Sequence, residues 1–392
     1  MAPQARVQQD HQRQTRERLR RACPSLSSLD ITRALRDART GDDMRNCGRF
    51  LSWIGGKGPI LLVAALGMGL LVPPLGEFSY RLLPLSAFLL TLGSFLTSGL
   101  AAPDKNGSGW LLGLAIVWVG LVLPLSAAVL LERMQLDPAL RIGVLLSLLA
   151  PPVGSAAAIA AMIGLKPRLA LVVSLTLTLA APISIPGFAA LLGLGVSFDV
   201  GRIAFRLFMI IGAAAALAKL SSVYRDRVSS VLPDQLAATG VAVLGLVIVG
   251  LATSHGVAGQ WISDRLRFLE MLAAAVIVNF GLCLLTTVLL GRLGLQIAGT
   301  IGLVSGNRNV TLAWAAASAG LPPLAESYVA TCVIPVLTLP LIIKACVSLT
   351  ARVRAMSRPA VHHDVRVSTL PEADNTALGH RTLIKTEAVR NA

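Results

Sequence analysis

The chain has 392 residues, of which 54% are hydrophobic and only 14% are charged. Its mean hydropathy of +0.71 excludes an ordinary water-soluble domain, in which about a quarter of the residues carry a charge. The formal net charge of +15 comes largely from the ends, because twelve Lys and Arg residues lie within residues 1–57 and seven within 351–392. Basic segments that flank apolar ones are typical of cytoplasmic anchors near anionic lipid, so membrane lipid is an expected partner and nucleic acid is not.

The apolar residues gather into about ten runs, most of them long enough to cross a hydrocarbon core of about 30 Å as a helix. Helices are expected because lipid offers no partner for an unpaired backbone group. The runs are predicted at residues 59–74, 79–100, 109–131, 139–163, 168–194, 203–220, 236–253, 267–291, 297–320 and 327–350. We expect residues 1–57 to form a basic cytoplasmic tail, 58–350 a transmembrane domain, and 351–392 a mobile polar tail.

Prolines and polar residues mark an internal repeat within these runs. The fourth run contains Ala150-Pro-Pro-Val-Gly-Ser155, and the ninth contains Ser305-Gly-Asn-Arg-Asn309, at a shift of about 153 residues. Because five spans reverse the direction of the chain, a second set of five is inverted relative to the first. Inverted repeats with helices interrupted at matching positions are the best sequence indication of a carrier's binding site. The sequence therefore predicts an all-α membrane protein of two inverted five-helix repeats.

Arg308 is the strongest single signal, because it lies near the middle of the ninth run. A charge there costs at least about 2.5 kcal/mol, and an arginine cannot lose its proton to avoid that cost. Its neighbours Ser305, Gly306, Asn307 and Asn309 interrupt an apolar run. A fixed cation at a helix break can attract an anionic substrate, and it can also neutralise carbonyl ends purely for stability. We favour the first interpretation and predict that all five residues contact substrate.

The break in the fourth run is predicted at Pro151-Pro152, because proline removes a donor and clashes with the preceding turn. Pro152, Gly154 and Ser155 are therefore candidate substrate-contacting residues, with a simple proline kink as the alternative. Asn279 in the eighth run is a further candidate, although such an amide also bonds its own helix or a neighbouring one.

Several classes of chemistry lack a sequence signal. No Asp, Glu or His lies in the middle of a predicted span, so proton coupling has no evident carrier. The chain has no HExxH, phosphate-loop or GxSxG signature, and we expect no enzymatic activity. Its five cysteines show no metal-type spacing, and no metal site is predicted.

The pattern resembles the bile acid:sodium symporter family, including its bacterial members, over about residues 59–350. The resemblance rests on the ten predicted spans, on the segment 149–155 and on the segment 300–312. It implies that the fourth and ninth helices are broken and cross near the membrane centre. It also implies a core domain of spans 3–5 and 8–10 that moves against a panel domain of spans 1, 2, 6 and 7.

The sequence departs from the sodium-coupled members of that family where they bind sodium. Aligned on Gly306, their carboxylate corresponds to Val304, and their Ser-Asn pair in the fourth helix falls near Ala157 and Ala158. The glutamine that often precedes their last asparagine is Arg308 here. A guanidinium repels a monovalent cation in a low-dielectric crossing, so we expect Arg308 to replace sodium and expect no cofactor.

From these observations we predict a secondary transporter of a small organic anion in a bacterial inner membrane, with both termini cytoplasmic. An anion or solute channel that uses the same crossing is one alternative. A membrane sensor that signals through its basic tails is another. The oligomeric state does not follow from the sequence.

Overall fold

The computed structural model describes residues 45–99, 109–192, 199–229, 232, 234–318 and 320–356. Within these ranges the regular structure is helical, apart from one isolated bridge between Pro152 and Arg308. Most of the two predicted tails lies outside the described residues. The described part begins with a helix at Arg45–Gly56, so helical structure starts before the predicted domain boundary at residue 58.

The helices follow the predicted runs in chain order. In the first half they are α3 (Gly58–Leu71), α4 (Pro73–Arg81), α5 (Leu83–Gly99), α6 (Gly109–Val117), α7 (Leu123–Arg133), α8 (Pro138–Leu149), α9 (Ala156–Met162) and α10 (Pro167–Leu191). In the second half they are α11 (Val200–Val223), α12 (Arg225–Val228), α13 (Gln235–Ser263), α14 (Arg265–Leu289), α15 (Leu295–Gly306), α16 (Val310–Ala317) and α17 (Pro323–Met356). A π-helical turn, η1 (Trp118–Val122), joins α6 to α7, and a 3-10 turn, η3 (Gly291–Leu293), precedes α15.

Five continuous helices in the described part are long and apolar enough to cross a membrane, or up to seven if two bent pairs each count as one span. Large apolar side chains also face outward, such as Ile183 on α10, 81% exposed, and Phe205 on α11, 65% exposed. Lipid is a favourable surrounding for such side chains, whereas water is not. The fold is thus that of an all-helical, multi-pass membrane protein.

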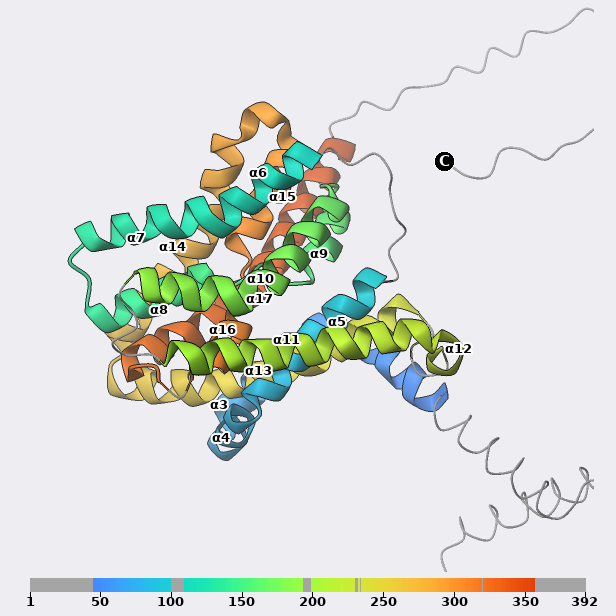
Figure 1. Cartoon of the computed structure of the whole chain (residues 1–392), viewed down its shortest axis with the longest axis horizontal. Helices are drawn as coiled ribbons and strands as arrows, with labels where there is room; N and C mark the ends of the chain where they lie inside the picture. Colours follow the sequence, from blue (N-terminus) through green and yellow to red (C-terminus); the bar gives the residue numbers. More distant parts are fainter. Residues whose placement is uncertain are drawn as a thin grey trace, which may run out of the picture. The chain divides into compact units, whose positions relative to one another are not determined.

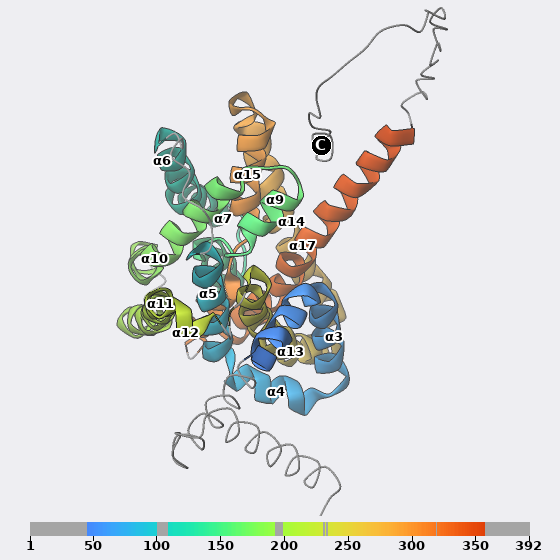
Figure 2. The ribbon, with the colours of Figure 1, turned by 90° about the vertical axis from the view of Figure 1, so that its right-hand side faces the viewer.

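The described helices up to residue 348 form one compact unit, and we name two sets of helices within it by their contacts. In the panel group, α13 lies against α3, α4 and α5, and α11 lies along α5 (Figure 1). Figure 2 shows α3 and α4 beside α13 from a second direction. In the core group, α14 packs on α15, and α10 packs on α9 and α15. This group also includes α8, which packs on α16 and on the start of α17. The two groups meet where α11 contacts α10 and where α5 contacts α16.

Glycines allow the closest helix approaches in both groups. A Cβ atom at Gly240 of α13 would lie 2.1 Å from the Leu51 carbonyl oxygen. One at Gly306 would lie 2.2 Å from the Asn279 carbonyl oxygen of α14. Both obstacles are backbone atoms, which cannot swing aside as a flexible side chain does. Gly306 therefore serves close packing of α15 on α14, a role that its place in the polar run did not reveal.

Two pairs of helical segments begin 156 residues apart. The span Gly109–Arg133 corresponds to Arg265–Leu289, and both contain 25 residues. The helix that starts at Pro167 likewise corresponds to the one that starts at Pro323. This spacing is close to the predicted shift of about 153 residues, and the bridged residues Pro152 and Arg308 also lie 156 apart.

Candidate functional site

The two predicted helix breaks exist and lie side by side. One separates α8 from α9, and the other separates α15 from α16. The Val153 amide donates to the Asn307 carbonyl at 3.0 Å, and the Asn309 amide donates to the Pro151 carbonyl at 2.6 Å. An unwound backbone needs such partners, because lipid cannot supply them. The unwound backbones of the two breaks therefore form hydrogen bonds with each other, and we call this place the crossing.

A shift of 156 residues relates these two hydrogen bonds to each other. It carries donor Val153 onto donor Asn309, and acceptor Pro151 onto acceptor Asn307. The antiparallel bridge between Pro152 and Arg308 lies at the centre of this exchange. This exchange is the ordinary pattern of an antiparallel bridge, and its centre joins residues that are 156 apart, as are the first residues of α10 and α17.

The Arg308 side chain is 3% exposed and donates to three backbone carbonyls. Its Nε lies 2.8 Å from the Ser305 oxygen, its NH1 nitrogen 3.2 Å from the Ala150 oxygen, and its NH2 nitrogen 3.1 Å from the Val119 oxygen. These bonds use three of the five N–H groups of a guanidinium. They are the contacts expected of an arginine that neutralises carbonyl ends at the break.

The break itself leaves two of these carbonyls without a main-chain donor. In an unbroken α15 the Ser305 oxygen would accept from the Asn309 amide, but that amide donates to Pro151 instead. The Ala150 oxygen loses its donor in the same way, because α8 ends at Leu149. Arg308 supplies the missing donors.

The third carbonyl is left unpaired by the π-helical turn. There the Leu123 amide donates to the Trp118 oxygen, five residues back, and so skips the Val119 oxygen. The next donor in that pattern would be Pro124, which has no N–H group. Arg308 thus links three elements at the points where each lacks a donor. The proline in the third span was the only sequence signal for this contact.

No carboxylate in the described part of the chain forms an ion pair with Arg308, although three other ion pairs are present. A buried charge without a counter-ion is unusual, because buried charges are normally paired. The three carbonyl dipoles orient toward the guanidinium but carry no net charge. The crossing therefore keeps one positive charge that no described acidic side chain neutralises.

A cavity of about 280 Å³ lies between the panel and core groups and reaches the crossing; we call it the crossing cavity. Its core-group walls include Ser155, Asn307, Arg308, Asn309 and Thr311. Its panel-group walls are mostly small or apolar residues of α3, α5 and α13: Gly58, Leu62, Leu90, Ser94, Thr239, Ala242, Val243 and Leu246. The cavity extends to Met162, which is 53% exposed. Its size and largely apolar walls suit a small organic ligand.

Asn307 lines the crossing cavity with a buried amide that has no internal partner. It is 1% exposed, and neither its Nδ2 nor its Oδ1 atom has a hydrogen-bond partner. Leaving a buried amide unpaired costs about 1–3 kcal/mol per group. Such a cost is expected at a site where a ligand completes the bonds.

Three other candidates from the sequence, Asn309, Ser305 and Asn279, have identifiable structural partners. Asn309 caps α16 by accepting from the Leu312 amide at 3.4 Å, and the Ser305 hydroxyl donates to Ile301 in its own helix at 2.7 Å. Asn279 donates to the Ala275 oxygen of α14 at 2.7 Å and does not line the crossing cavity. Its expected contact with substrate is not supported by this placement.

A smaller pocket of about 10 Å³ lies behind the crossing, beside Gly154. It is lined by hydroxyl groups from both helix groups, including Thr91, Ser94, Ser174 and Thr178. The Ser174 oxygen is buried and has no partner. A volume of this order holds about one water molecule.

Neither the expected carboxylate position nor the carbonyls at the breaks offer a free ligand to a sodium ion. Val304 occupies the expected carboxylate position and is fully buried among apolar neighbours. The break carbonyls of Ala150 and Ser305, which could bind a cation, are taken by the positively charged Arg308. Within the described residues, no group of three or more His, Cys, Asp or Glu side chains could hold a metal ion.

Comparison with known proteins adds no family assignment: no family model matches the chain, and no curated protein matches it significantly. Fold and site therefore define the class of protein: a multi-pass helical membrane protein with two interrupted helices paired at a buried arginine.

Proposed function

We propose that the protein is a secondary transporter of a small organic anion, similar in plan to bile acid:sodium symporters. In this proposal the broken pairs α8–α9 and α15–α16 and the helix α17 each cross the membrane once, which gives ten spans. The 156-residue spacing, which two pairs of helical segments share with the bridged residues Pro152 and Arg308, supports two inverted repeats. Carriers bind their substrates where such interrupted helices meet.

The observation that carries the proposal is the unpaired amide of Asn307 at the end of the crossing cavity. A side chain that only stabilised the fold would have found partners, as Asn279 and Asn309 have. A ligand with a carboxylate or similar group would accept from the Asn307 Nδ2 atom. Its apolar body would lie against the walls formed by α3, α5 and α13.

The charge at the crossing favours an anion. Arg308 leaves a positive charge with no described acidic partner, and the apolar surroundings strengthen its field. The α16 helix begins at Val310, so its N-terminal end adds to the positive potential at Asn309. A negatively charged group would balance this charge, whereas sodium would be repelled. We therefore propose transport without sodium coupling, in a bacterial inner membrane and with cytoplasmic termini.

Replacing Asn307 by leucine separates binding from stability. Because the amide is buried and unpaired, Asn307→Leu is expected to leave the melting temperature in detergent unchanged or to raise it. The same variant should lose the rise in melting temperature that a bound organic anion gives the wild type. The measurement is a thermal-shift screen of carboxylates and sulfonates on both proteins.

Asn279→Leu is the matched control, because Asn279 bonds its own helix outside the crossing cavity. It should lower the melting temperature and keep the response to the anion. Equal ligand responses in wild type and Asn307→Leu would contradict the proposed site.

A further inference from the structure

A second cavity of about 270 Å³ also lies between the panel and core groups; we call it the vestibule. Its walls are polar and aromatic: Tyr80, His255, Gln260, Ser263, Trp314, Glu326 and Ser327. It is separate from the crossing cavity. On α16, Thr311 lines the crossing cavity and Trp314 lines the vestibule, so one helical turn divides them.

The two cavities lie toward opposite ends of α13. Leu246 lines the crossing cavity and His255 lines the vestibule, nine residues further on, or about 13 Å along the helix axis. The fully buried Trp314 and the partly buried Tyr80 both line the vestibule, with ring centroids 6.0 Å apart.

Polar contacts join the two helix groups around the vestibule. The Tyr80 hydroxyl of α4 donates to Oε1 of Glu326 on α17, which also accepts from Trp314 Nε1 at 3.1 Å. The Gln260 Nε2 atom of α13 donates to the Ser327 hydroxyl at 3.1 Å. Both contacts run from the panel group to the start of α17.

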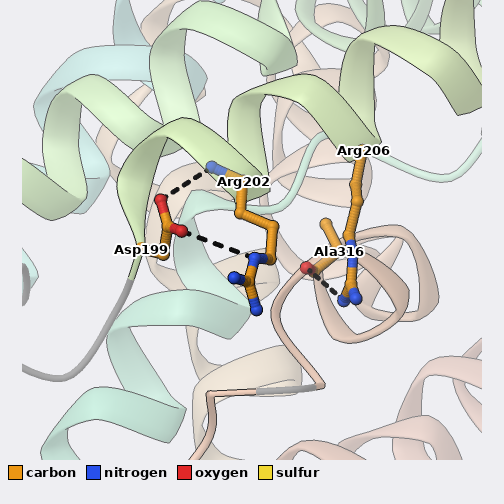
Figure 3. A network of polar contacts seen from close by, with 4 residues as sticks. All are labelled: Asp199, Arg202, Arg206 and Ala316. Atoms are coloured by element: carbon orange, nitrogen blue, oxygen red, sulfur yellow. Dashed lines mark hydrogen bonds and ion pairs between the residues drawn. The ribbon is translucent and has the colours of Figure 1, made fainter.

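A third contact comes from α11. Figure 3 shows Arg206 extending from α11 to the Ala316 carbonyl near the end of α16, at 3.4 Å. The neighbouring Arg202 bonds Asp199 at the start of its own helix instead. Arg206 supplies a donor and a positive charge to the C-terminal end of α16, where carbonyls lack partners.

The crossing cavity has no such contacts. None of the described residues that line it makes a side-chain hydrogen bond from one helix group to the other. Polar contacts join the groups at one end, whereas at the other end a cavity lies between them beside the close approach of Ser94 to Gly154. This asymmetry is expected of a carrier caught open toward one side, since alternating access moves one helix bundle against the other around a fixed site.

We infer that Tyr80, Gln260 and Arg206, with Glu326, Ser327 and the Ala316 carbonyl, form the closed gate of the carrier. The inference rests on the proposed transport function. It adds which side of the carrier is closed to solvent and which contacts hold that side closed. With both termini cytoplasmic, the crossing cavity faces the cytoplasm and the gate faces the outside. Opening the gate would connect the vestibule to the crossing, while the opposite end closes.

The test uses a reporter cysteine at Thr311, in a protein whose five native cysteines are replaced by alanine. Thr311 lines the crossing cavity one turn from Trp314. The protein with the reporter cysteine and no gate substitution should react with a membrane-impermeant thiol reagent added on the side of the membrane where α13 begins. The reagent should react very slowly when it is added on the opposite side, which we call the second side. Tyr80→Phe, Gln260→Leu and Arg206→Met each remove one gate contact. Combining the first two should raise the second-side labelling rate by about tenfold.

Tyr328→Phe is the matched control, because Tyr328 is fully buried within the core group. It removes a hydroxyl without touching the gate and should leave second-side labelling unchanged. An unaltered first-side rate shows that each variant is folded. Unchanged second-side labelling in folded gate variants would overturn the inference. Labelling needs no substrate, so it tests the gate even if the protein carries no organic anion. Conversely, a negative labelling result would rule out this gate but not transport.

Discussion

Replacing Arg308 by alanine is expected to be the most destabilising single substitution at the crossing. It leaves the Val119, Ala150 and Ser305 carbonyls buried without donors, and each unpaired group costs about 1–3 kcal/mol. We expect a loss of at least about 3 kcal/mol in the free energy of unfolding. The measurement is reversible denaturation in mild detergent, or the shift in melting temperature where unfolding is irreversible.

Two further variants separate charge from geometry. Arg308→Lys keeps the positive charge, but a lysine cannot donate to three separated carbonyls. This variant should therefore still bind the anion, although its free energy of unfolding is lowered. In a Pro124→Ala background, residue 124 has an amide that can donate to the Val119 carbonyl. Arg308→Ala should therefore lower the free energy of unfolding less in that background than in the wild type. Equal costs of Arg308→Ala in both backgrounds would refute the link between Arg308 and the π-helical turn.

Replacing Gly154 by alanine is expected to disturb the contact between the core and panel groups at the crossing. The added Cβ would lie 1.7 Å from the Ser94 hydroxyl oxygen and 2.2 Å from its Cβ. Ser94 belongs to α5, so the clash acts between the groups. We expect a loss of about 1–3 kcal/mol in stability, as for other overpacked sites, together with reduced transport.

Ser94→Gly provides the compensating change. It removes the hydroxyl oxygen and the Cβ atom that clash. The remaining Cα atom of residue 94 would lie 3.2 Å from the new Cβ at position 154. The double variant should regain most of the lost stability, apart from the cost of a glycine in a helix, which is about 1 kcal/mol. If Ser94→Gly gave no recovery, this contact would not be the cause of the Gly154→Ala effect.

The positions of the helices followed from the sequence, because apolar runs of membrane length leave few other solutions. The breaks at Pro151-Pro152 and around Arg308 were also predictable, since paired prolines and a charge have no other simple place in a span. The first spans were harder: α3 and α4 meet at Val72 beside two prolines, and the preceding helix begins at Arg45, inside the predicted tail.

The site was predicted less completely than the fold. Five of the predicted residues line the crossing cavity: Gly154, Ser155, Asn307, Arg308 and Asn309. The other four do not line it: Pro152, Asn279, Ser305 and Gly306. The role of Arg308 depends on the carbonyl of Val119, 189 residues away in the chain. Likewise, Glu326 was placed outside any span, and only the packing of α4 on α13 brings Tyr80 to it. Such contacts depend on how helices pack, and no local pattern records that.

Transport through the crossing is tested most directly by uptake into proteoliposomes. The substrate is an organic anion that raises the melting temperature of the wild type, and uptake is measured in sodium-free buffer. We predict saturable uptake without sodium that is lost in Asn307→Leu and retained in a folded Asn279→Leu protein. Uptake that requires a sodium gradient, or that is unaffected by Asn307→Leu, would contradict a sodium-independent anion carrier with its site at the crossing.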